Sequence, residues 1–221
     1  MSWLSIVGMG EDGPDGLSPA ARAALVGASH AFGGRRHLAL AAPVLTGVAH
    51  PWLSPLSESV DAIVALEGKP VCVLASGDPF HFGIGATLAR RIDPRQMRVF
   101  PHPSSFSLAA ARLGWPLQDV QTISLHGRSL ALIRPHLHPG ARILALTSDE
   151  NGPAELAQLL TEAGFGASIV TVLEALGGPG ETIRSQVAMG FDLNDINPLN
   201  ICALSIVPLP DARILPLTPG L

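Results

Sequence analysis

The first half of the chain alternates short apolar runs with amphipathic segments. The apolar runs predict strands over residues 3–7, 30–32, 71–75 and 98–100. The segments between and after them predict helices over residues 18–25, 57–67, 84–91 and 104–113, and Ser18-Pro19 supplies a cap and a first-turn proline for the earliest of these. Strands that alternate with helices in this way predict a mainly parallel sheet with helices on both faces.

The second half begins with the same alternation and ends in consecutive strands. Strands are predicted over residues 122–125, 143–146, 169–173, 182–188 and 200–207, and helices over residues 130–137 and 153–162. Gly114-Trp115-Pro116 interrupts the pattern between the halves. The sequence therefore predicts an α/β protein with a first lobe over residues 1–114, a second lobe with a mixed sheet over 115–208, and a Pro-rich tail or start of a linker over 209–221.

Composition narrows the class of protein. Of 221 residues, 47% are hydrophobic and only 14% are charged, so a sizeable core is available. The formal net charge of −4 argues against a nucleic-acid partner, because binding to phosphates needs a basic surface. No apolar run approaches the ~20 residues of a membrane span. Cys72 and Cys202 lie far apart in apolar runs, and the first residues lack an export signal, which together predict a soluble cytoplasmic protein with buried free thiols.

The apolar run that begins at Val71 leads into a polar, Gly-rich turn, Ser76-Gly77-Asp78-Pro79. In parallel α/β sheets ligands bind at the carboxyl ends of the strands, where this turn is predicted to lie. Its backbone N–H groups and the carboxylate of Asp78 are therefore candidates for ligand binding. An ordinary connection between a strand and a helix remains the alternative, because glycine, aspartate and proline are common turn residues.

A second glycine motif follows the first strand. Residues 8–13, GMGEDG, match the G-x-G-x-x-G pattern that places a dinucleotide pyrophosphate at a helix N-terminus. Glu11 and Asp12 oppose this interpretation, since they put two carboxylates where a phosphate would sit. The second strand also offers no acidic residue for a ribose hydroxyl. Arg35 or Arg36 could instead hold a 2′-phosphate, so an NADP-dependent reductase remains an alternative function.

The histidines and serines favour neither a metal site nor a serine hydrolase. His136 and His138 have no carboxylate or thiol at useful spacing, and no metal site is expected. A serine hydrolase of the G-x-S-x-G type is excluded because the chain lacks that motif. His81, His102 and His126 each lie in or after a turn that follows a predicted strand, which places them at the predicted ligand edge.

Three motifs together carry a resemblance to a known family. They are residues 7–10 (VGMG) with Leu17-Ser18, residues 74–80 (LASGDPF) with Phe82-Gly83, and residues 103–105 (PSS) with 109–114 (AAARLG). In this order and spacing they resemble the tetrapyrrole (corrin/porphyrin) methylases, over nearly the whole chain. Residues 124–128 (SLHGR) and 146–148 (LTS) are most similar to the members that act on precorrin-6Y, in the domain that methylates carbon 5 of the corrin ring.

The resemblance implies a two-lobed methyltransferase that holds S-adenosylmethionine folded up between its lobes and releases S-adenosylhomocysteine. It also implies that the first glycine loop, with Gly10, borders the macrocycle and does not bind a pyrophosphate. Glu11-Asp12-Gly13 replaces the Gly-Pro-Gly common in that loop, which departs from the family pattern. Carried over to this sequence, the cofactor contacts fall on Ser76, Gly77, Asp78, His81, Ser104, Ser105, Thr147 and Leu176.

Methyl transfer to an electron-rich ring carbon needs alignment more than it needs a strong nucleophile. Asp78 is the candidate to complement the positive charge of the donor, and His126 or His102 could accept the proton that is lost. Because the substrate carries many carboxylates, arginines are its expected contacts, and the candidates are Arg35, Arg36, Arg112 and Arg128.

Three further expectations rest on the resemblance. The first is a homodimer. The second is fusion to, or partnership with, a decarboxylating domain that methylates carbon 15, because the end of the chain, residues 216–221, resembles the linker of the fused enzyme. The third is an alternative in which this chain is a non-catalytic donor-binding domain of such a fusion.

Overall fold

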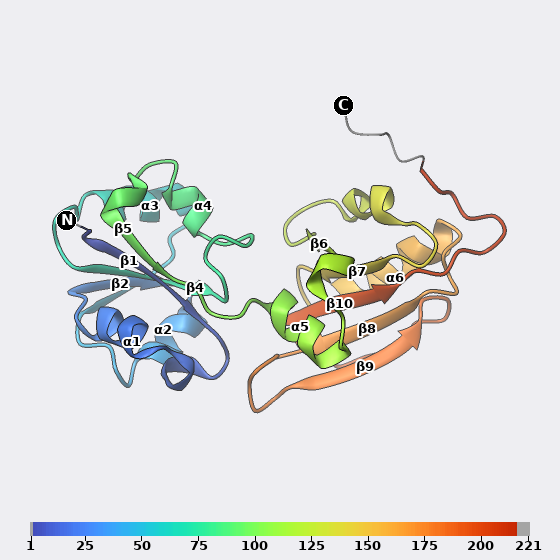
Figure 1. Ribbon diagram of the computed structural model, residues 1–221, viewed down its shortest axis with the longest axis horizontal. Coiled ribbons are helices and arrows are strands. Elements are labelled where there is room, and N and C mark those ends of the chain that lie inside the picture. Colours follow the sequence, from blue (N-terminus) through green and yellow to red (C-terminus); the bar gives the residue numbers. More distant parts are fainter. Residues whose placement is uncertain (1, 216–221) are drawn as a thin grey trace. The chain divides into compact units, whose positions relative to one another are not determined.

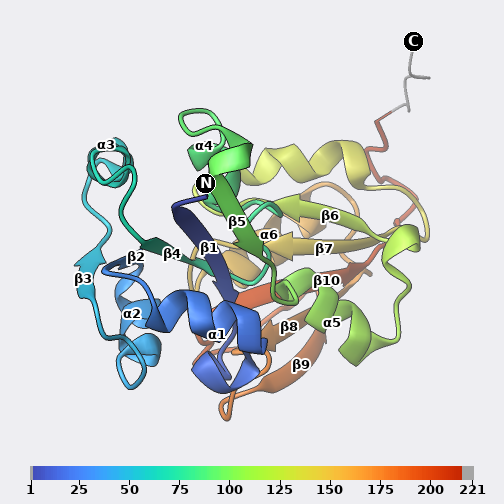
Figure 2. The same cartoon turned by 60° about the vertical axis from the view of Figure 1, so that its left-hand side comes forward.

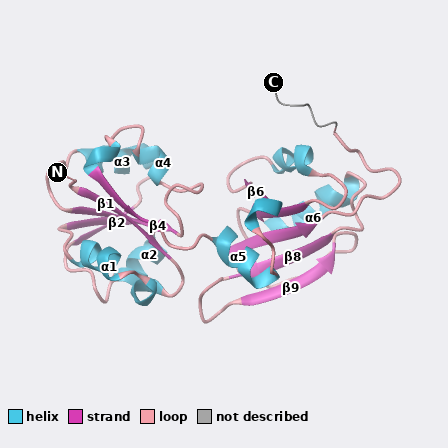
Figure 3. Ribbon diagram, in the orientation of Figure 1, coloured by secondary structure: helices cyan, strands magenta, loops and turns pink. Residues whose placement is uncertain are grey.

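The computed structural model describes residues 2–215 and divides the chain into two compact units, Met1–Ser104 and Ser105–Leu221. Each unit contains one five-stranded sheet with helices packed on it (Figures 1 and 3).

The sheet of the first unit, sheet A, is entirely parallel. Its strand order is β3-β2-β4-β1-β5, so the central strand β4 lies between β2 and β1. The strands are β1 (Leu4–Met9), β2 (His30–Gly33), β3 (Val48–Pro51), β4 (Val71–Ser76) and β5 (Met97–Phe100). Parallel pairing brings the carboxyl ends of all these strands to one edge of the sheet.

Helices cover both faces of sheet A (Figure 1). One face packs against α1 (Pro19–Val26) and α2 (Arg35–Ala41), and the other against α3 (Leu56–Val64) and α4 (Gly85–Leu88). Strand β1 shows why: Leu4 and Ile6 belong to the core on the α3 side, and Val7 and Met9 to the core on the α1 side. A strand buried on both faces has to be apolar along most of its length, as β1 and β4 are.

The sheet of the second unit, sheet B, is mixed. Its strand order is β6-β7-β10-β8-β9, and all five strands are labelled in Figure 2. Strands β6 and β7 are parallel, and the other neighbouring pairs are antiparallel. The strands are β6 (Gln121–Ser124), β7 (Arg142–Leu146), β8 (Ile169–Glu174), β9 (Thr182–Val187) and β10 (Asn200–Ser205).

Side chains on the two faces of sheet B belong to two separate hydrophobic cores. Leu144, Ile201 and Ala203 pack against α5 (Ser105–Leu113), which contributes Phe106, Ala109 and Ala110. Ile143, Cys202 and Leu204 point to the other face, where α6 (Gly152–Glu162) and a 3₁₀ segment (Leu130–His136) cover them. The two-residue period of a strand assigns neighbours to opposite faces.

The predicted fold class is confirmed: sheet A is parallel with helices on both faces, and sheet B is mixed. The predicted boundary at Gly114 is displaced, because the structure divides at Ser104. Helix α5 belongs to the second unit, since its apolar face packs on sheet B. Helix α2 and strand β3 were not predicted; α2 buries a single side chain, Ala41, and all four residues of β3 keep some solvent exposure, so neither has a periodic signal.

The first part of the predicted tail belongs to the second unit. The N–H of Leu209 donates to the carbonyl of Gly164 (2.8 Å), and that of Arg213 donates to the carbonyl of Ala163 (3.0 Å). Gly164 has φ +85°, and an added Cβ there would lie 2.5 Å from the Cα of Ala212. Residues 209–213 therefore pack on the turn after α6, and residues 216–221, where a linker was expected, lie outside the described residues.

Candidate functional site

At the carboxyl edge of sheet A, three backbone segments press against one another at glycines. A Cβ on Gly8, in β1, would lie 1.9 Å from the carbonyl oxygen of Gly77 and 2.7 Å from the nitrogen of His102. Gly77 has φ +56°, and its Cβ would lie 2.8 Å from the Cα of Ser104. Hydrogen bonds join the same segments, from Gly77 N–H to Met9 O (3.1 Å) and from His102 N–H to Gly77 O (3.3 Å). The glycines are needed here because backbone approaches backbone.

The turn after β4 presents the Asp78 carboxylate on this edge. Its Oδ1 accepts from the N–H of Phe80 (2.8 Å), and the Asp78 carbonyl accepts from the N–H of His81 (3.2 Å). Asp78 is half-buried, Ser76 is exposed, and the His81 ring stacks on that of Phe82. Within residues 2–215 no cationic side chain forms an ion pair with Asp78. The carboxylate thus caps the turn through Oδ1.

Each carboxylate of the first loop has a side-chain partner. Glu11 forms an ion pair with Arg36, and Asp12 Oδ2 lies 3.4 Å from His102 Nε2. Gly10 lies against this second pair, since a Cβ there would be 2.7 Å from Asp12 Oδ1 and 2.8 Å from His102 Cε1. The loop is therefore held at the edge of the sheet by the Glu11–Arg36 ion pair and by the contact between Asp12 and His102.

That geometry does not suit a dinucleotide site. Gly8 lies inside β1, and α1 begins only at Pro19, with its N-terminus capped by Ser18 Oγ, which accepts from the N–H of Ala21 (3.2 Å). A pyrophosphate cradle would need an uncapped helix N-terminus directly after the glycines. The structure accordingly offers no support for the reductase alternative.

His37 is a neutral imidazole beside a permanent cation. Its Nε2 accepts from Arg36 Nη2 (2.9 Å), because a guanidinium can only donate. Burial, followed by the charge of Arg36, lowers the pKa of His37 to about 4. The pair Glu11–Arg36 and this imidazole together fix the start of α2 against the first loop.

The candidate residues of the second unit gather at the end of sheet B where β6, β7 and β8 finish. Thr147 follows β7 directly and is 4% exposed; its hydroxyl lies 2.5 Å from Oδ1 of Asn200, the first residue of β10. The amide nitrogen of Asn200 donates to the carbonyls of Asp149 (3.0 Å) and Asn197 (2.9 Å). Both partners are acceptors only, so Oδ1 must face Thr147 and the threonine hydroxyl must donate.

His126 lies beside Thr147. Its Nδ1 is 3.1 Å from the Thr147 carbonyl, which can only accept, so this nitrogen carries the proton. In the neutral ring Nε2 then holds a lone pair, which is the form that a proton acceptor requires. The neighbouring N–H of Gly127 donates to Ser148 Oγ (3.0 Å), and the two loops that follow β6 and β7 are thereby joined.

A buried carboxylate closes this end of the sheet. Glu174, the last residue of β8, is 3% exposed and accepts from Arg184 Nε (3.0 Å), Thr182 Oγ1 (2.9 Å) and the N–H of Asn197 (2.7 Å). Burial alone raises the pKa of such a group, but these hydrogen bonds outweigh it and hold the Glu174 pKa below its ordinary value. Next to it, Ala175 adopts φ +45° and donates its N–H to Leu199 O (2.9 Å).

The predicted arginines fall into two classes. Arg36 is engaged by Glu11, and Arg112 donates to both oxygens of Glu181, Nε to Oε1 at 2.5 Å and Nη2 to Oε2 at 3.0 Å. Arg35 and Arg128 are exposed, and their side chains form no ion pair or hydrogen bond within the described part of the chain. Only the second class has free guanidinium donors for a carboxylate ligand.

The remaining predicted contacts are Ser104, Ser105 and Leu176. Ser104 is buried against Gly77, and Ser105 begins α5. Leu176 is 8% exposed, and its side chain packs in the core beneath α5. Any ligand contact of Leu176 would therefore fall on its main chain.

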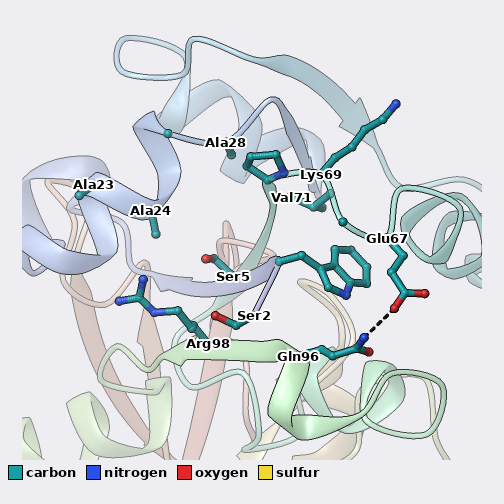
Figure 4. A pocket seen from close by; sticks show the side chains of 14 residues that line it. Ser2, Ser5, Ala23, Ala24, Ala28, Glu67, Lys69, Val71, Gln96 and Arg98 are labelled. Carbon is teal, nitrogen blue, oxygen red and sulfur yellow. Dashed lines mark hydrogen bonds between the residues drawn. The ribbon is translucent and has the colours of Figure 1, made fainter.

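A cavity of about 460 Å³ lies elsewhere, at the amino ends of the sheet A strands (Figure 4). Ser5, Val71 and Arg98 line it from β1, β4 and β5, and Gln96 donates to Glu67 (2.6 Å) at one side. Because the strands are parallel, this cavity is at the opposite end from Asp78 and Gly10, and it does not contain any of the predicted site residues.

Between residues 2 and 215 no three His, Cys, Asp or Glu side chains are grouped so that they could hold a metal ion. Over the same residues, no helix has the length and apolar character needed to cross a membrane.

Asn200, Glu174 and Arg184 were not predicted as part of the site. Glu174 has a weak signal, as an acidic residue that directly follows an apolar strand run. Asn200 has none, because its partners Thr147 and Asp149 lie 53 and 51 residues away in the sequence.

Comparisons with known proteins agree with this architecture. Residues 4–188 match the family model "Tetrapyrrole (Corrin/Porphyrin) Methylases". The chain is 57% identical over 218 residues to the decarboxylating precorrin-6Y C(5,15)-methyltransferase of Sinorhizobium sp, covering 99% of this chain and 53% of that protein. The chain thus spans about half the length of this curated relative.

A second relative is close to this chain in extent. The cobalt-precorrin-7 C(5)-methyltransferase of Salmonella typhimurium is 30% identical over 197 residues, which cover 87% of this chain and 96% of that protein. Among solved structures, the precorrin-6Y methylase (cbiE) of Archaeoglobus fulgidus superposes with a TM-score of 0.68 at 25% identity, over 94% of this chain and 98% of that one. Because the family model matches residues 4–188, most of this chain, and because the two relatives are similar to it in sequence, the chain belongs to the tetrapyrrole methylase family.

Proposed function

We propose that this chain transfers a methyl group from S-adenosylmethionine to carbon 5 of a precorrin or cobalt-precorrin macrocycle in cobalamin biosynthesis. One observation carries the choice of carbon. The Sinorhizobium sp protein, of which this chain matches 53%, is named for methylation at carbons 5 and 15 and for decarboxylation. The Salmonella typhimurium protein, of which this chain matches 96%, is named for methylation at carbon 5 alone. The part shared by both is this chain, so the shared reaction is assigned to it.

The residues at the edge of sheet A fit a cationic methyl donor. S-adenosylmethionine supplies an electrophilic methyl group on a positively charged sulfur, and it also carries an ammonium group. Asp78 is half-buried at the carboxyl edge and has no cationic partner within residues 2–215, in contrast to Glu11, which is paired with Arg36. A carboxylate in such a position attracts a cation more strongly than a fully solvated one. We assign Asp78 to the donor, with Ser76, Gly77, His81, Ser104 and Ser105 around it.

In the second unit the donor contacts are assigned to the main chain at Thr147 and Leu176. The threonine hydroxyl is already committed to Asn200, and the leucine side chain is committed to the core. Their backbone groups, at the ends of β7 and β8, remain for hydrogen bonds to a nucleoside. His126 is assigned as the proton acceptor, since its Nδ1–H is held by the Thr147 carbonyl and Nε2 carries the lone pair.

The macrocycle is assigned to the free arginines and to Gly10. Arg35 follows β2 and Arg128 follows β6, so each is placed at the carboxyl end of a strand in its own unit. Arg36 and Arg112 were also candidates, but Glu11 and Glu181 already occupy their guanidinium groups. A free arginine can bind a carboxylate through two parallel hydrogen bonds.

The donor assignment is tested by calorimetry with S-adenosylmethionine, S-adenosylhomocysteine and NADPH. We expect both sulfur nucleosides to bind and NADPH not to bind. Asp78→Asn retains an oxygen for the Phe80 N–H and removes the charge, so it should weaken the binding of S-adenosylmethionine more than that of the product, whose sulfur is uncharged. Asp61→Asn, which removes an exposed carboxylate on α3, is the control and should change neither affinity. Binding of NADPH alone would refute the proposal and favour the reductase.

The reaction is tested by mass spectrometry of a precorrin or cobalt-precorrin acceptor after incubation with the chain and the donor. One added methyl group is expected. Two added methyl groups with loss of carbon dioxide would contradict the assignment to carbon 5 alone. Donor binding without methylation of either acceptor would instead favour a non-catalytic binding domain.

Localisation and assembly complete the proposal. We place the protein in the cytoplasm, which is consistent with two buried cysteines that are both free thiols. A homodimer and a neighbouring decarboxylating domain that methylates carbon 15 are proposed from the family resemblance. Light scattering on purified protein tests the first, and co-purification with that domain tests the second.

A further inference from the structure

We propose that Asn200 is a positioning residue for the donor site of the second unit, acting through Thr147 and Asn197. The inference rests on the proposed function, because it concerns the same donor. Asn200 is 9% exposed and uses both amide hydrogens and its carbonyl oxygen in hydrogen bonds within the protein. It therefore has no direct contact to offer a ligand, and its effect has to be transmitted by its partners.

Asn200 contacts one of the two segments assigned to the donor directly, at Thr147 and Asp149, and is linked to the other through Asn197. Toward β7, Oδ1 holds the Thr147 hydroxyl, and Nδ2 holds the carbonyl of Asp149, two residues further along. These bonds fix the main chain where β7 ends and α6 is about to begin. Gly152, at the start of α6, allows this closeness, since a Cβ there would lie 2.5 Å from the Cβ of Thr147.

Toward β8, the connection runs through Asn197. Its carbonyl accepts from Asn200 Nδ2, and its N–H donates to Glu174 Oε2 at 2.7 Å. Glu174 precedes Ala175, whose φ of +45° is a conformation that costs a non-glycine residue free energy. Such a conformation persists only where neighbouring bonds hold it, and here the Glu174 carboxylate and the Leu199 carbonyl do so.

The Asn200 side chain is thus bonded to the β7 side directly and linked to the β8 side through Asn197. A nucleoside bound by main-chain groups needs those groups at fixed positions, and small displacements weaken several hydrogen bonds together. Loss of the Asn200 amide should consequently weaken donor binding more than a substitution elsewhere in sheet B that causes the same loss in the free energy of unfolding.

The test compares two matched substitutions in sheet B. Thr147→Val removes the hydroxyl bonded to Asn200. Thr171→Val removes an equally buried hydroxyl, 8% exposed, whose partner is Ser185 Oγ at 2.8 Å in the interior of the β8–β9 pair. Affinity for S-adenosylhomocysteine is measured by calorimetry, and stability by urea unfolding.

We expect Thr147→Val to weaken binding about tenfold, Thr171→Val to stay within about twofold of wild type, and both to lose similar stability. Thr147→Ser, which restores the hydroxyl, should recover most of the affinity. Asn200→Ala should weaken binding at least as much as Thr147→Val, and the double variant should be no worse than Asn200→Ala, because the two side chains act as one unit.

If Thr147→Val binds S-adenosylhomocysteine as tightly as Thr171→Val does, Asn200 has a structural role only and the inference is overturned. If Asn200→Ala does not fold, the two threonine variants and the serine rescue still decide the question. Wild-type protein that binds neither sulfur nucleoside would instead remove the proposed function, and the two failures are thereby distinguished.

Discussion

The two sheet edges that carry the candidate site are built by different means. At the edge of sheet A, backbone meets backbone at Gly8 and Gly77, and the side-chain contacts around it, Glu11–Arg36 and Asp12–His102, retain partial exposure. At the edge of sheet B, buried side chains join the strand ends, from Thr147 through Asn200 to Glu174. One edge depends on the absence of side chains and the other on their hydrogen bonds, so substitutions should harm them for different reasons.

The largest effect is expected from Gly8→Ala. The new Cβ would meet a carbonyl oxygen and a backbone nitrogen that cannot rotate away, so the strands of sheet A would have to separate. We expect a loss of more than about 3 kcal/mol in the free energy of unfolding, or failure to fold. Gly180→Ala is the control, because its Cβ would meet only Ala175 Cβ at 3.9 Å, and its effect should be within about 0.5 kcal/mol. Equal stability of the two variants by urea unfolding would show that the edge of sheet A is not built on close approach.

Next in size is Glu174→Gln at the edge of sheet B. The substitution leaves Arg184 without its carboxylate and gives the Asn197 N–H a poorer acceptor. Since Arg184 is one-third exposed, we expect a loss of about 2–3 kcal/mol, less than for a fully buried pair. Asp61→Asn breaks the exposed pair with Arg91 and should cost less than about 1 kcal/mol. If chemical denaturation gave the same loss in the free energy of unfolding for Glu174→Gln and Asp61→Asn, the buried network of sheet B would stabilise the protein no more than an exposed ion pair does.

Acid should distinguish the two edges by the pH at which each weakens. The pKa of His37 falls from its ordinary 6.5 to about 4 on folding, so the neutral form stabilises the first unit above pH 6.5, and this stability is lost as the pH falls toward 4. Allowing for partial exposure, the loss is about 1–2 kcal/mol. The Glu174 pKa is also lowered on folding, from an ordinary 4.5, so its contribution to the second unit is lost only below that pH.

One buried thiol in each sheet allows this difference to be measured. Cys72 lies in β4 and Cys202 in β10, and burial raises the pKa of both to about 12. Labelling with dithiodipyridine, which reacts with exposed thiols in mild acid, should modify Cys72 before Cys202 between pH 6.5 and 4.5. His37→Gln should remove that order, and His138→Gln in the second unit should preserve it. Earlier labelling of Cys202 in the wild type would reverse the comparison.

The smallest effect concerns the arginines, of which each unit contributes one paired and one free candidate. Arg35→Ala and Arg128→Ala should each raise the KM for the macrocycle about fivefold, roughly 1 kcal/mol, by removing a contact to a substrate carboxylate. Arg112→Ala should leave the KM nearly unchanged, because Glu181 already holds that guanidinium. Steady-state kinetics with saturating donor measures all three. A larger effect at Arg112 than at Arg35 would show that the ion pair with Glu181 opens to admit substrate.

Much of the fold could be predicted from local pattern. Strands β1, β4 and β8 each have six residues that are mostly apolar. Helices α1, α5 and α6 each have a regular apolar face, so the type of all six elements could be predicted from the hydrophobic pattern. Helix α2 and strand β3 could not be predicted in this way, because they bury almost no apolar side chains. The boundary at Gly114 was displaced because the turn there is local, whereas the side on which α5 packs is decided by Phe106 and Ala109 against sheet B.

The site divides along the same line. The sequence by itself determined the Gly77-Asp78 turn after a buried strand, the serines after β5 and the loops after β6 and β7, since each is a short contiguous motif at the end of an apolar run. Only the tertiary structure decided that Gly8 serves close packing, that Arg36 and Arg112 are engaged, and that Asn200 joins Thr147 to Asn197. The physical reason is distance along the chain: periodicity and turn chemistry act between near neighbours, but an ion pair or buried amide is defined by groups that folding alone brings together.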